Sequence, residues 1–259
     1  MEKRDERLKK IIQTLKINTA STIQELADEL SVSHMTVRRD LEVLTRQNIV
    51  KLLYGGVVLK QSQTITQDET KYSLLDAGSV NPQEKMRIGK AAASLLEPND
   101  IIIIDSGSTT EYLAKYIPDD FPLTIICYAL NILLECVQKN SCRLLFAGGN
   151  YHDNTLMFEG EEGIQLIGHT RATKAFLSAS GISGPLGVTC SNSYERLTKR
   201  AVINSSQKKI LLADSSKFGT VQTEYFADLD EFDIMITDTE ISDEYRDILH
   251  EKNLELKEV

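Results

Sequence analysis

The sequence predicts an α/β protein of two domains, with a small, mainly helical domain in front of a larger one built on a parallel sheet. In the first sixty residues, apolar side chains recur at helical spacing and are followed by two β-rich runs around a Gly-Gly pair. From about residue 100 onward, apolar runs of strand length alternate with helical stretches. A chain of 259 residues has room for both domains. We expect them at residues 1–60 and 80–259, joined by a polar linker over residues 61–79.

The first domain begins with three predicted helices. The first has one apolar face, formed by Leu8, Ile11, Ile12 and Leu15. Thr22 and Glu25 then have the spacing of a capping box, which marks the start of a second helix. A turn over residues 31–33, in which Ser33 can cap the next helix, leads to a third helix from His34 to about Gln47. Its buried face is expected to carry Val37, Leu41 and Leu44. Two helices joined by so short a turn form a helix-turn-helix.

The start of the third helix carries polar and basic side chains off its apolar face. In a helix-turn-helix this end reaches the base edges in the major groove of DNA. The β-rich runs around Gly55-Gly56 predict a hairpin that would act as a wing on the DNA backbone. The candidate DNA-binding residues are Ser33, His34, Met35, Thr36, Arg38 and Arg39 of the helix, with Lys51 and Tyr54 of the wing. A helical dimerisation or protein-binding module is the alternative.

Arg38 and Arg39 are the natural contacts to guanine or phosphate among these residues. Asp40 follows them directly, and its carboxylate would repel phosphate. We therefore expect Asp40 to pair with a nearby Arg or to hold the fold.

The charge is unevenly divided along the chain. Residues 1–60 hold 11 Lys and Arg against 8 Asp and Glu, a net charge of +3, so the remainder carries −12 of the total of −9. A basic front and an acidic rear fit a DNA-binding head on a soluble body, although +3 is also within ordinary variation.

The charged N-terminus predicts no secretory signal, and no apolar run approaches the ~20 residues of a membrane span. The four cysteines, Cys127, Cys136, Cys142 and Cys190, lack paired spacing and are expected to be reduced thiols of a cytoplasmic protein.

The second domain repeats an apolar run followed by small or polar residues. The runs cover residues 101–104, 123–127, 143–146, 174–177, 209–212 and 232–236. Runs that are apolar on both faces fit a covered parallel sheet, and a helix near residues 84–96 opens the domain. Ligands of such sheets bind at the carboxyl ends of the strands, where the polar loops would gather.

The sharpest candidate site in this domain is the loop Asp105–Thr110. Gly107 lets the backbone turn, and Ser106, Ser108, Thr109 and Thr110 supply hydroxyl groups. A helix starts directly afterwards, and its N-terminus favours an anion such as a phosphate monoester. The spacing is not that of a Walker A loop. A Ser/Thr-rich helix cap without a ligand remains the alternative.

Charged residues elsewhere in the domain could complete such a site. Lys217 follows a predicted strand and could neutralise a phosphate. Glu195 and Lys199 are spaced i, i+4 on a predicted helix, so they either form a surface pair or both point into a pocket.

The chain resembles the DeoR family of bacterial transcriptional regulators over nearly its whole length. In the first domain the resemblance rests on residues 32–41, including the Arg38-Arg39-Asp40-Leu41 run, and on the wing at Tyr54-Gly55-Gly56, where the family usually has His in place of Tyr54. In the second domain the matching segments are residues 105–109, 146–149, 175–176, 187–189, 195–199 and 212–219.

The resemblance implies a winged helix-turn-helix and an effector domain with the fold of ribose-5-phosphate isomerase and glucosamine-6-phosphate deaminase. It further implies a repressor of a sugar or nucleoside operon that a phosphorylated sugar releases from double-stranded operator DNA. By this likeness the effector-binding residues are Asp105, Ser106, Gly107, Ser108, Thr109, Thr110, Tyr128, Gly148, Gly149, Glu195, Lys199 and Lys217. Two departures are visible. Cys127-Tyr128 replaces the common Thr-Asn pair, and Thr173 replaces an acidic residue. The Cys-Tyr form is similar to the branch of the family that represses deoxyribonucleoside operons, which implies deoxyribose 5-phosphate as the effector.

An enzyme is the competing class, because proteins of this fold isomerise or deaminate sugar phosphates. Asp105, Glu195 and Asp214 would be its candidate bases. The first sixty residues argue against it, since an isomerase needs no recognition helix. His34, His152, His169 and His250 lack metal-ligand spacing, so we expect no metal or other cofactor and no catalytic residues. Binding two half-sites of an operator would require a homo-oligomer, a dimer or larger.

Overall fold

The computed structural model describes residues 2–18, 20–46, 50–53, 56–59 and 72–259, and the chain divides into two units at residues 1–70 and 71–259. In these ranges no helix combines the length and the apolar character that a membrane span requires.

The first unit is a winged helix-turn-helix, as the sequence predicted. Its helices are α1 Glu2–Asn18, α2 Ile23–Leu30 and α3 His34–Arg46, and its strands are β1 Ala20–Ser21, β2 Val50–Leu53 and β3 Gly56–Leu59. The predicted hairpin is β2 paired antiparallel with β3, and β1, which the sequence pattern did not indicate, pairs with the other edge of β3. Val37, Leu41 and Leu44 lie in the core with Ile11 and Leu15 of α1, which confirms the predicted faces.

Local hydrogen bonds set the ends of the two helices of the motif. The Glu25 amide donates to the Thr22 hydroxyl at 3.1 Å, and the Thr22 amide donates to the Glu25 carboxylate at 2.8 Å, so the predicted capping box forms. The chain leaves α2 through Ser31 in the left-handed region at φ 52°. The Thr36 amide then donates to the Ser33 hydroxyl at 3.2 Å at the start of α3.

Asp40 is buried on α3 and pairs with two arginines of α1. The Nε atoms of Arg4 and Arg7 lie 3.2 and 2.8 Å from its two carboxylate oxygens. The expectation that Asp40 pairs with a nearby Arg is thus confirmed, and the pair joins the recognition helix to the first helix. Its hydrogen bond to Asp40 raises the pKa of Arg7.

The second unit is built on a parallel seven-stranded sheet with the order β15-β14-β12-β9-β4-β5-β6. Its strands are β4 Ile101–Ile104, β5 Leu123–Cys127, β6 Cys142–Phe146, β9 Ala172–Ser178, β12 Ser206–Leu212, β14 Ile234–Thr237 and β15 Glu255–Glu258. Each of the six predicted apolar runs lies in or overlaps one of these strands. The edge strand β15 was missed because its residues are mostly charged.

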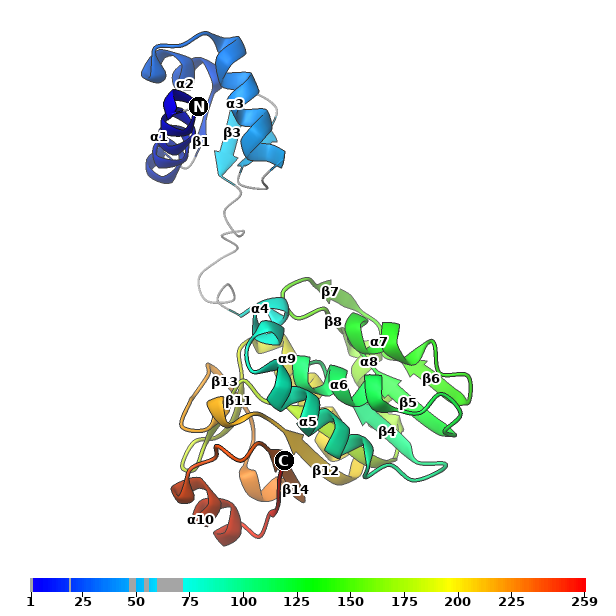
Figure 1. Ribbon diagram of the computed structural model, residues 1–259. Coiled ribbons are helices and arrows are strands. Elements are labelled where there is room, and N and C mark those ends of the chain that lie inside the picture. Colours follow the sequence, from blue (N-terminus) through cyan, green and yellow to red (C-terminus); the bar gives the residue numbers. More distant parts are fainter. Residues whose placement is uncertain (1, 19, 47–49, 54–55, 60–71) are drawn as a thin grey trace. The chain divides into compact units, whose positions relative to one another are not determined.

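Helices cover both faces of this sheet (Figure 1). They are α4 Leu74–Ser79, α5 Pro82–Ala93, α6 Ser108–Tyr116, α7 Leu130–Cys136, α8 Glu161–His169, α9 Ser193–Asn204 and α10 Asp243–Glu251. Ile88, Leu113 and Ile132 place α5, α6 and α7 in the core on one face. On the other face, α8, α9 and α10 pack in a second core. The sheet is therefore buried on both sides, which explains strands without polar alternation.

Short strands outside this sheet were not predicted. A three-stranded antiparallel sheet consists of β10 Gly181–Ser183, β11 Gly187–Cys190 and β13 Glu224–Ala227, and a hairpin consists of β7 Asn150–His152 and β8 Met157–Glu159. Residues 74–79, which the sequence pattern assigned to the linker over residues 61–79, form α4 of the second unit. Leu74 is buried there, so this stretch belongs to the folded domain, and residues 60–71 lie outside the described residues.

Candidate functional sites

The candidate DNA-binding surface is the exposed start of α3. Ser33, His34, Arg38 and Arg39 are exposed, Thr36 is half-buried, and Met35 is 59% exposed although it is apolar. An exposed Met at the tip of a recognition helix suits contact with a thymine methyl group. Tyr54 and the side chain of Lys51 lie outside the described residues, so the wing contacts stay predictions.

The second candidate site lies where the strand order of the large sheet reverses. The chain runs from β4 outward through β5 and β6, then returns to β9 on the other side of β4. The loops that follow β4 and β9 therefore diverge at this point, and ligands of open α/β sheets bind in the resulting crevice. The loop Asp105–Thr110 follows β4, and Ser178 ends β9.

Asp105 joins four segments at this crevice. Its carboxylate, which is fully buried, accepts hydrogen bonds from the Tyr128 hydroxyl after β5 and from the Ser178 amide at 2.8 Å. The Lys199 ammonium on α9 donates to the same carboxylate at 2.5 Å and to the Ser178 carbonyl at 3.1 Å. Both carboxylate oxygens of Asp105 therefore accept hydrogen bonds from the protein itself. Asp105 holds the segments around the crevice together and is not a free carboxylate that could act as a general base. Ser178 was missed by the sequence analysis because nothing local marks it.

Glu195 and Lys199 are both buried, with their charged atoms 3.8 Å apart. The surface-pair alternative is therefore excluded, and both side chains point inward. The Asn192 amide and side chain hold one Glu195 oxygen at 3.1 and 2.8 Å. Burial raises the pKa of Glu195 despite Lys199 and Asn192, whereas burial opposes the charge of Lys199 but Asp105 and Glu195 outweigh it and raise its pKa.

The loop after β4 turns its carbonyl groups toward side chains. The Thr110 hydroxyl lies 2.8 Å from the Asp105 carbonyl, the Ser178 hydroxyl donates to the Ser106 carbonyl at 2.6 Å, and the Asn131 amide donates to the Gly107 carbonyl at 3.3 Å. Among the described residues no acceptor lies on the backbone N–H groups of residues 106–110. A run of N–H donors at a helix N-terminus is the geometry that binds a phosphate.

Gly107 permits this loop by its lack of a side chain. A Cβ atom on it would lie 2.5 Å from the Ser178 hydroxyl oxygen and 2.9 Å from the Ser178 Cβ. The close approach of the β4 and β9 loops therefore requires glycine at this position.

Two family models match the chain and together cover most of it. The DeoR C terminal sensor domain matches residues 80–239, and the DeoR-like helix-turn-helix domain matches residues 7–63. The chain belongs to the DeoR family. It is therefore a DNA-binding transcriptional regulator with a sensor domain, and the enzyme alternative is set aside.

Curated relatives of this DeoR-family chain carry regulator names. The deoxyribose operon repressor of Escherichia coli strain K12 is 33% identical over 94% of both chains. The regulator GolR of Listeria innocua is 33% identical over 92% of this chain and 91% of its own, and the repressor GlcR of Bacillus subtilis is 30% identical over 97% and 95%.

Among solved structures, ribose 5-phosphate isomerase A of Methanocaldococcus jannaschii aligns with a TM-score of 0.41 at 14% identity, over 53% of this chain and 55% of its own. The sorbitol operon regulator SorC of Klebsiella pneumoniae aligns with a TM-score of 0.38 at 12% identity, over 84% and 91%.

Gly148 and Gly149 of this DeoR-family chain follow β6 among the predicted effector residues. Both pack against the next elements: a Cβ on Gly149, at φ 151°, would lie 2.2 Å from the Glu159 carbonyl oxygen, and one on Gly163 of α8 would lie 2.7 Å from the Gly148 oxygen. Close backbone packing is a sufficient reason for Gly149, whereas a Cβ on Gly148 would fit, since its nearest neighbour is the Phe146 ring at 3.9 Å. Tyr128 is fully buried, and its hydroxyl donates to Asp105.

Lys217 lies in the loop after β12, beside a buried cluster around Asp214. The Asn81 amide and the Ser216 hydroxyl donate to Asp214 Oδ1 at 2.9 and 2.5 Å, and Lys85 Nζ is 4.0 Å from Asp214 Oδ2. Burial opposes the charge of Asp214, but the hydrogen bonds from Ser216 and Asn81, with Lys217 and Lys85, outweigh it and lower its pKa. Lys217 is half-buried, and its ammonium has no acidic partner within the described ranges.

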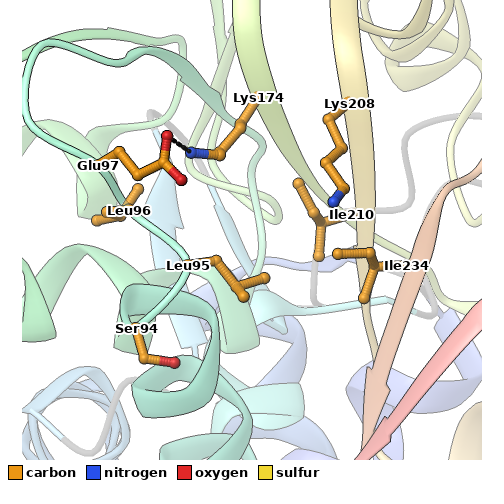
Figure 2. Close-up of a pocket in the computed structure, with 8 residues that line it drawn as sticks. All are labelled: Ser94, Leu95, Leu96, Glu97, Lys174, Lys208, Ile210 and Ile234. Atoms are coloured by element: carbon orange, nitrogen blue, oxygen red, sulfur yellow. Dashed lines mark ion pairs between the residues drawn. The ribbon is translucent and has the colours of Figure 1, made fainter.

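A hollow of about 210 Å³ lies at the opposite edge of the sheet, at the amino ends of β9 and β12 (Figure 2). Its Lys174 is already paired, at 2.6 Å with Asp100 and 3.6 Å with Glu97. Thr173, which stands where the family commonly has an acid, bonds Asp100 at 2.7 Å. This edge is not where ligands of open α/β sheets bind, so we do not assign the effector to it.

Proposed function

We propose that this DeoR-family regulator represses an operon for the breakdown of a sugar or nucleoside, and that a phosphorylated sugar releases it from its operator. The observation that carries the proposal is the run of unpartnered N–H groups at residues 106–110 in the crevice of the sheet. A phosphate there would accept hydrogen bonds from these groups, and the half-buried Lys217 at the same edge would add positive charge. The regulator would act in the cytoplasm, where operator DNA is.

Deoxyribose 5-phosphate is the effector to test first. Tyr128 supports it, because the Cys127-Tyr128 pair resembles the deoxyribonucleoside branch of the family. The 33% identity to the deoxyribose operon repressor over 94% of the chain supports it as well. We further propose a homo-oligomer, since two recognition helices are needed to read two half-sites about one helical turn apart.

Operator retention tests the proposal. The full chain is bound at fixed salt to DNA from upstream of its own gene and titrated with deoxyribose 5-phosphate, ribose 5-phosphate, deoxyribose and inorganic phosphate. Release by a sugar phosphate, with no release by deoxyribose, is expected. Specific binding that no sugar phosphate disturbs would refute the effector assignment, while the DNA-binding assignment would stand.

Gly107→Ala is expected to raise the concentration of sugar phosphate needed for release by about tenfold or more, because the added methyl group displaces Ser178 or the loop. Operator affinity without effector should stay within about twofold, since the head is untouched. Gly168→Ala is the matched control, because a Cβ there meets nothing within 4 Å. Equal release of the two variants would show that the loop does not hold the effector.

A further inference from the structure

Residues 72–81, called here the anchor segment, lie at the start of the second unit and contain α4. Tyr72 is the first described residue after the interval 60–71, through which the chain connects to the helix-turn-helix. Both ends of the anchor segment are held by residues that are linked, by hydrogen bonds or by their place in the same loop, to candidate effector residues.

The first end is held by the loop between β7 and β8. The Leu74 amide donates to the Asn154 carbonyl at 2.7 Å, and the Asn154 side chain donates to the Tyr72 carbonyl at 3.4 Å. The same Asn154 amide lies 3.3 Å from the side-chain oxygen of Asn192, which in turn holds Glu195. A short chain of hydrogen bonds thus connects the Tyr72 backbone with the carboxylate beside Lys199.

The side chain of Tyr72 is half-buried and lies within electrostatic range of this carboxylate cluster. Burial raises the pKa of Tyr72, and the negative charges of Glu195 and Asp105 raise it further, so the phenol lies within the field of both groups. Its hydroxyl makes no hydrogen bond within the described part of the chain. Tyr72 is half-buried, and its hydroxyl is not one of the buried polar atoms without a partner, so the hydroxyl remains accessible and a sugar hydroxyl would supply a partner.

The second end is held by the Asp214 cluster. Lys85 Nζ is buried and donates to the carbonyls of Ala77 and Val80 at 2.5 and 2.7 Å, which ties down the end of α4. Asn81 donates to Asp214 at 2.9 Å, in the loop that carries Lys217. Burial lowers the pKa of Lys85, and the positive charge of Lys217 lowers it further, so the two ammonium groups lie close enough to repel each other.

Between its two ends, the anchor segment lies against the loop Asp105–Thr110, called here the phosphate loop because the proposed function places a phosphate there. A Cβ built on Gly78 of α4 would be 3.8 Å from the Cβ of Ser108, the first residue of α6. An alanine would fit at that distance, whereas a larger side chain would push α4 away from residues 106–110.

We infer that the anchor segment is one wall of the effector site: Tyr72 contacts the sugar, α4 closes over the phosphate loop, and occupancy is thereby communicated to the segment that continues into the helix-turn-helix. This rests on the proposed function. A ligand shifts a conformational equilibrium only by its different affinity for the two states. Contact with the anchor segment provides that difference, because the ligand gains these interactions only when the segment is docked.

Hydrogen exchange on the full chain tests the docking directly. Saturating deoxyribose 5-phosphate is expected to slow exchange of the α4 amides by about threefold or more relative to those of the edge strand β15. Unchanged exchange in α4, with binding proved by calorimetry, would overturn the inference.

Binding of two probes, deoxyribose 5-phosphate and inorganic phosphate, to three variants tests whether the anchor segment forms a wall of the site. Tyr72→Phe should weaken deoxyribose 5-phosphate about tenfold but leave inorganic phosphate within about twofold, since the lost hydroxyl reads the sugar. Gly78→Leu should weaken both probes about tenfold or more, and Gly78→Ala should weaken neither. A Tyr72→Phe variant that binds the sugar phosphate like the unaltered chain refutes the contact. If the unaltered chain binds no sugar phosphate, the proposed function fails as well, so the two failures are distinguishable.

Discussion

Replacing Lys199 with Met is expected to lower the free energy of unfolding of the second unit by about 3–5 kcal/mol at neutral pH. Lys199 is 2.5 Å from Asp105 and 3.8 Å from Glu195, and all three side chains are buried. Methionine keeps most of the volume but leaves two carboxylates in the interior without a cation. Hydrogen exchange of the central strands β4 and β9 measures the loss.

The pH dependence of this loss gives a second readout. Burial raises the pKa of Glu195 and Lys199 opposes that rise, so without Lys199 the pKa of Glu195 in the folded chain rises further above its unfolded value. The destabilisation from Glu195 then develops as pH rises through its unfolded value, roughly 4, and is smaller at pH 5 than at pH 7. Lys115→Met is the control. Lys115 is 40% exposed and pairs with Glu111 on the surface of α6, so its loss should cost less than about 1 kcal/mol. Equal losses for both variants would contradict the buried network.

Arg38→Ala is expected to weaken operator binding by about 1–3 kcal/mol, or roughly 5- to 150-fold, if Arg38 reads a guanine. Arg38 is exposed on α3 near its start, off the face buried by Val37 and Leu41, so the fold should be unaffected. Retention of operator DNA at several salt concentrations measures the effect, and calorimetry with the sugar phosphate should show unchanged effector binding.

The salt series separates a base contact from a phosphate contact. Loss of a base contact weakens binding to the operator more than to unrelated DNA, whereas loss of a phosphate contact weakens both and reduces the salt slope by about 1. Arg143→Ala, an exposed arginine on β6, serves as the control and should bind as the unaltered chain does. Unchanged operator affinity at matched salt would remove Arg38 from the DNA-binding surface.

The sequence by itself determined the helix-turn-helix and the strands of the large sheet. The capping box at Thr22 and Glu25 and the buried positions of α3 were predicted correctly because they depend on residues three or four apart. The strands were predicted because both faces of the sheet are covered, so each is a continuous apolar run. Where the periodicity was absent, as in the charged β15, no local signal marked the strand.

Only the tertiary structure decided what the charged groups of the candidate site do. Asp105 meets Ser178, 73 residues away, and Lys199, 94 residues away, because β9 returns to lie beside β4. The order of strands in a sheet is not encoded in local spacing, so the sequence alone left Glu195 and Lys199 undecided between a surface pair and a pocket. It also left residues 74–79 in a linker. Burial of Leu74 and the tie from Lys85 make that stretch a helix of the domain, since six residues gain helical structure from packing rather than from their own propensity.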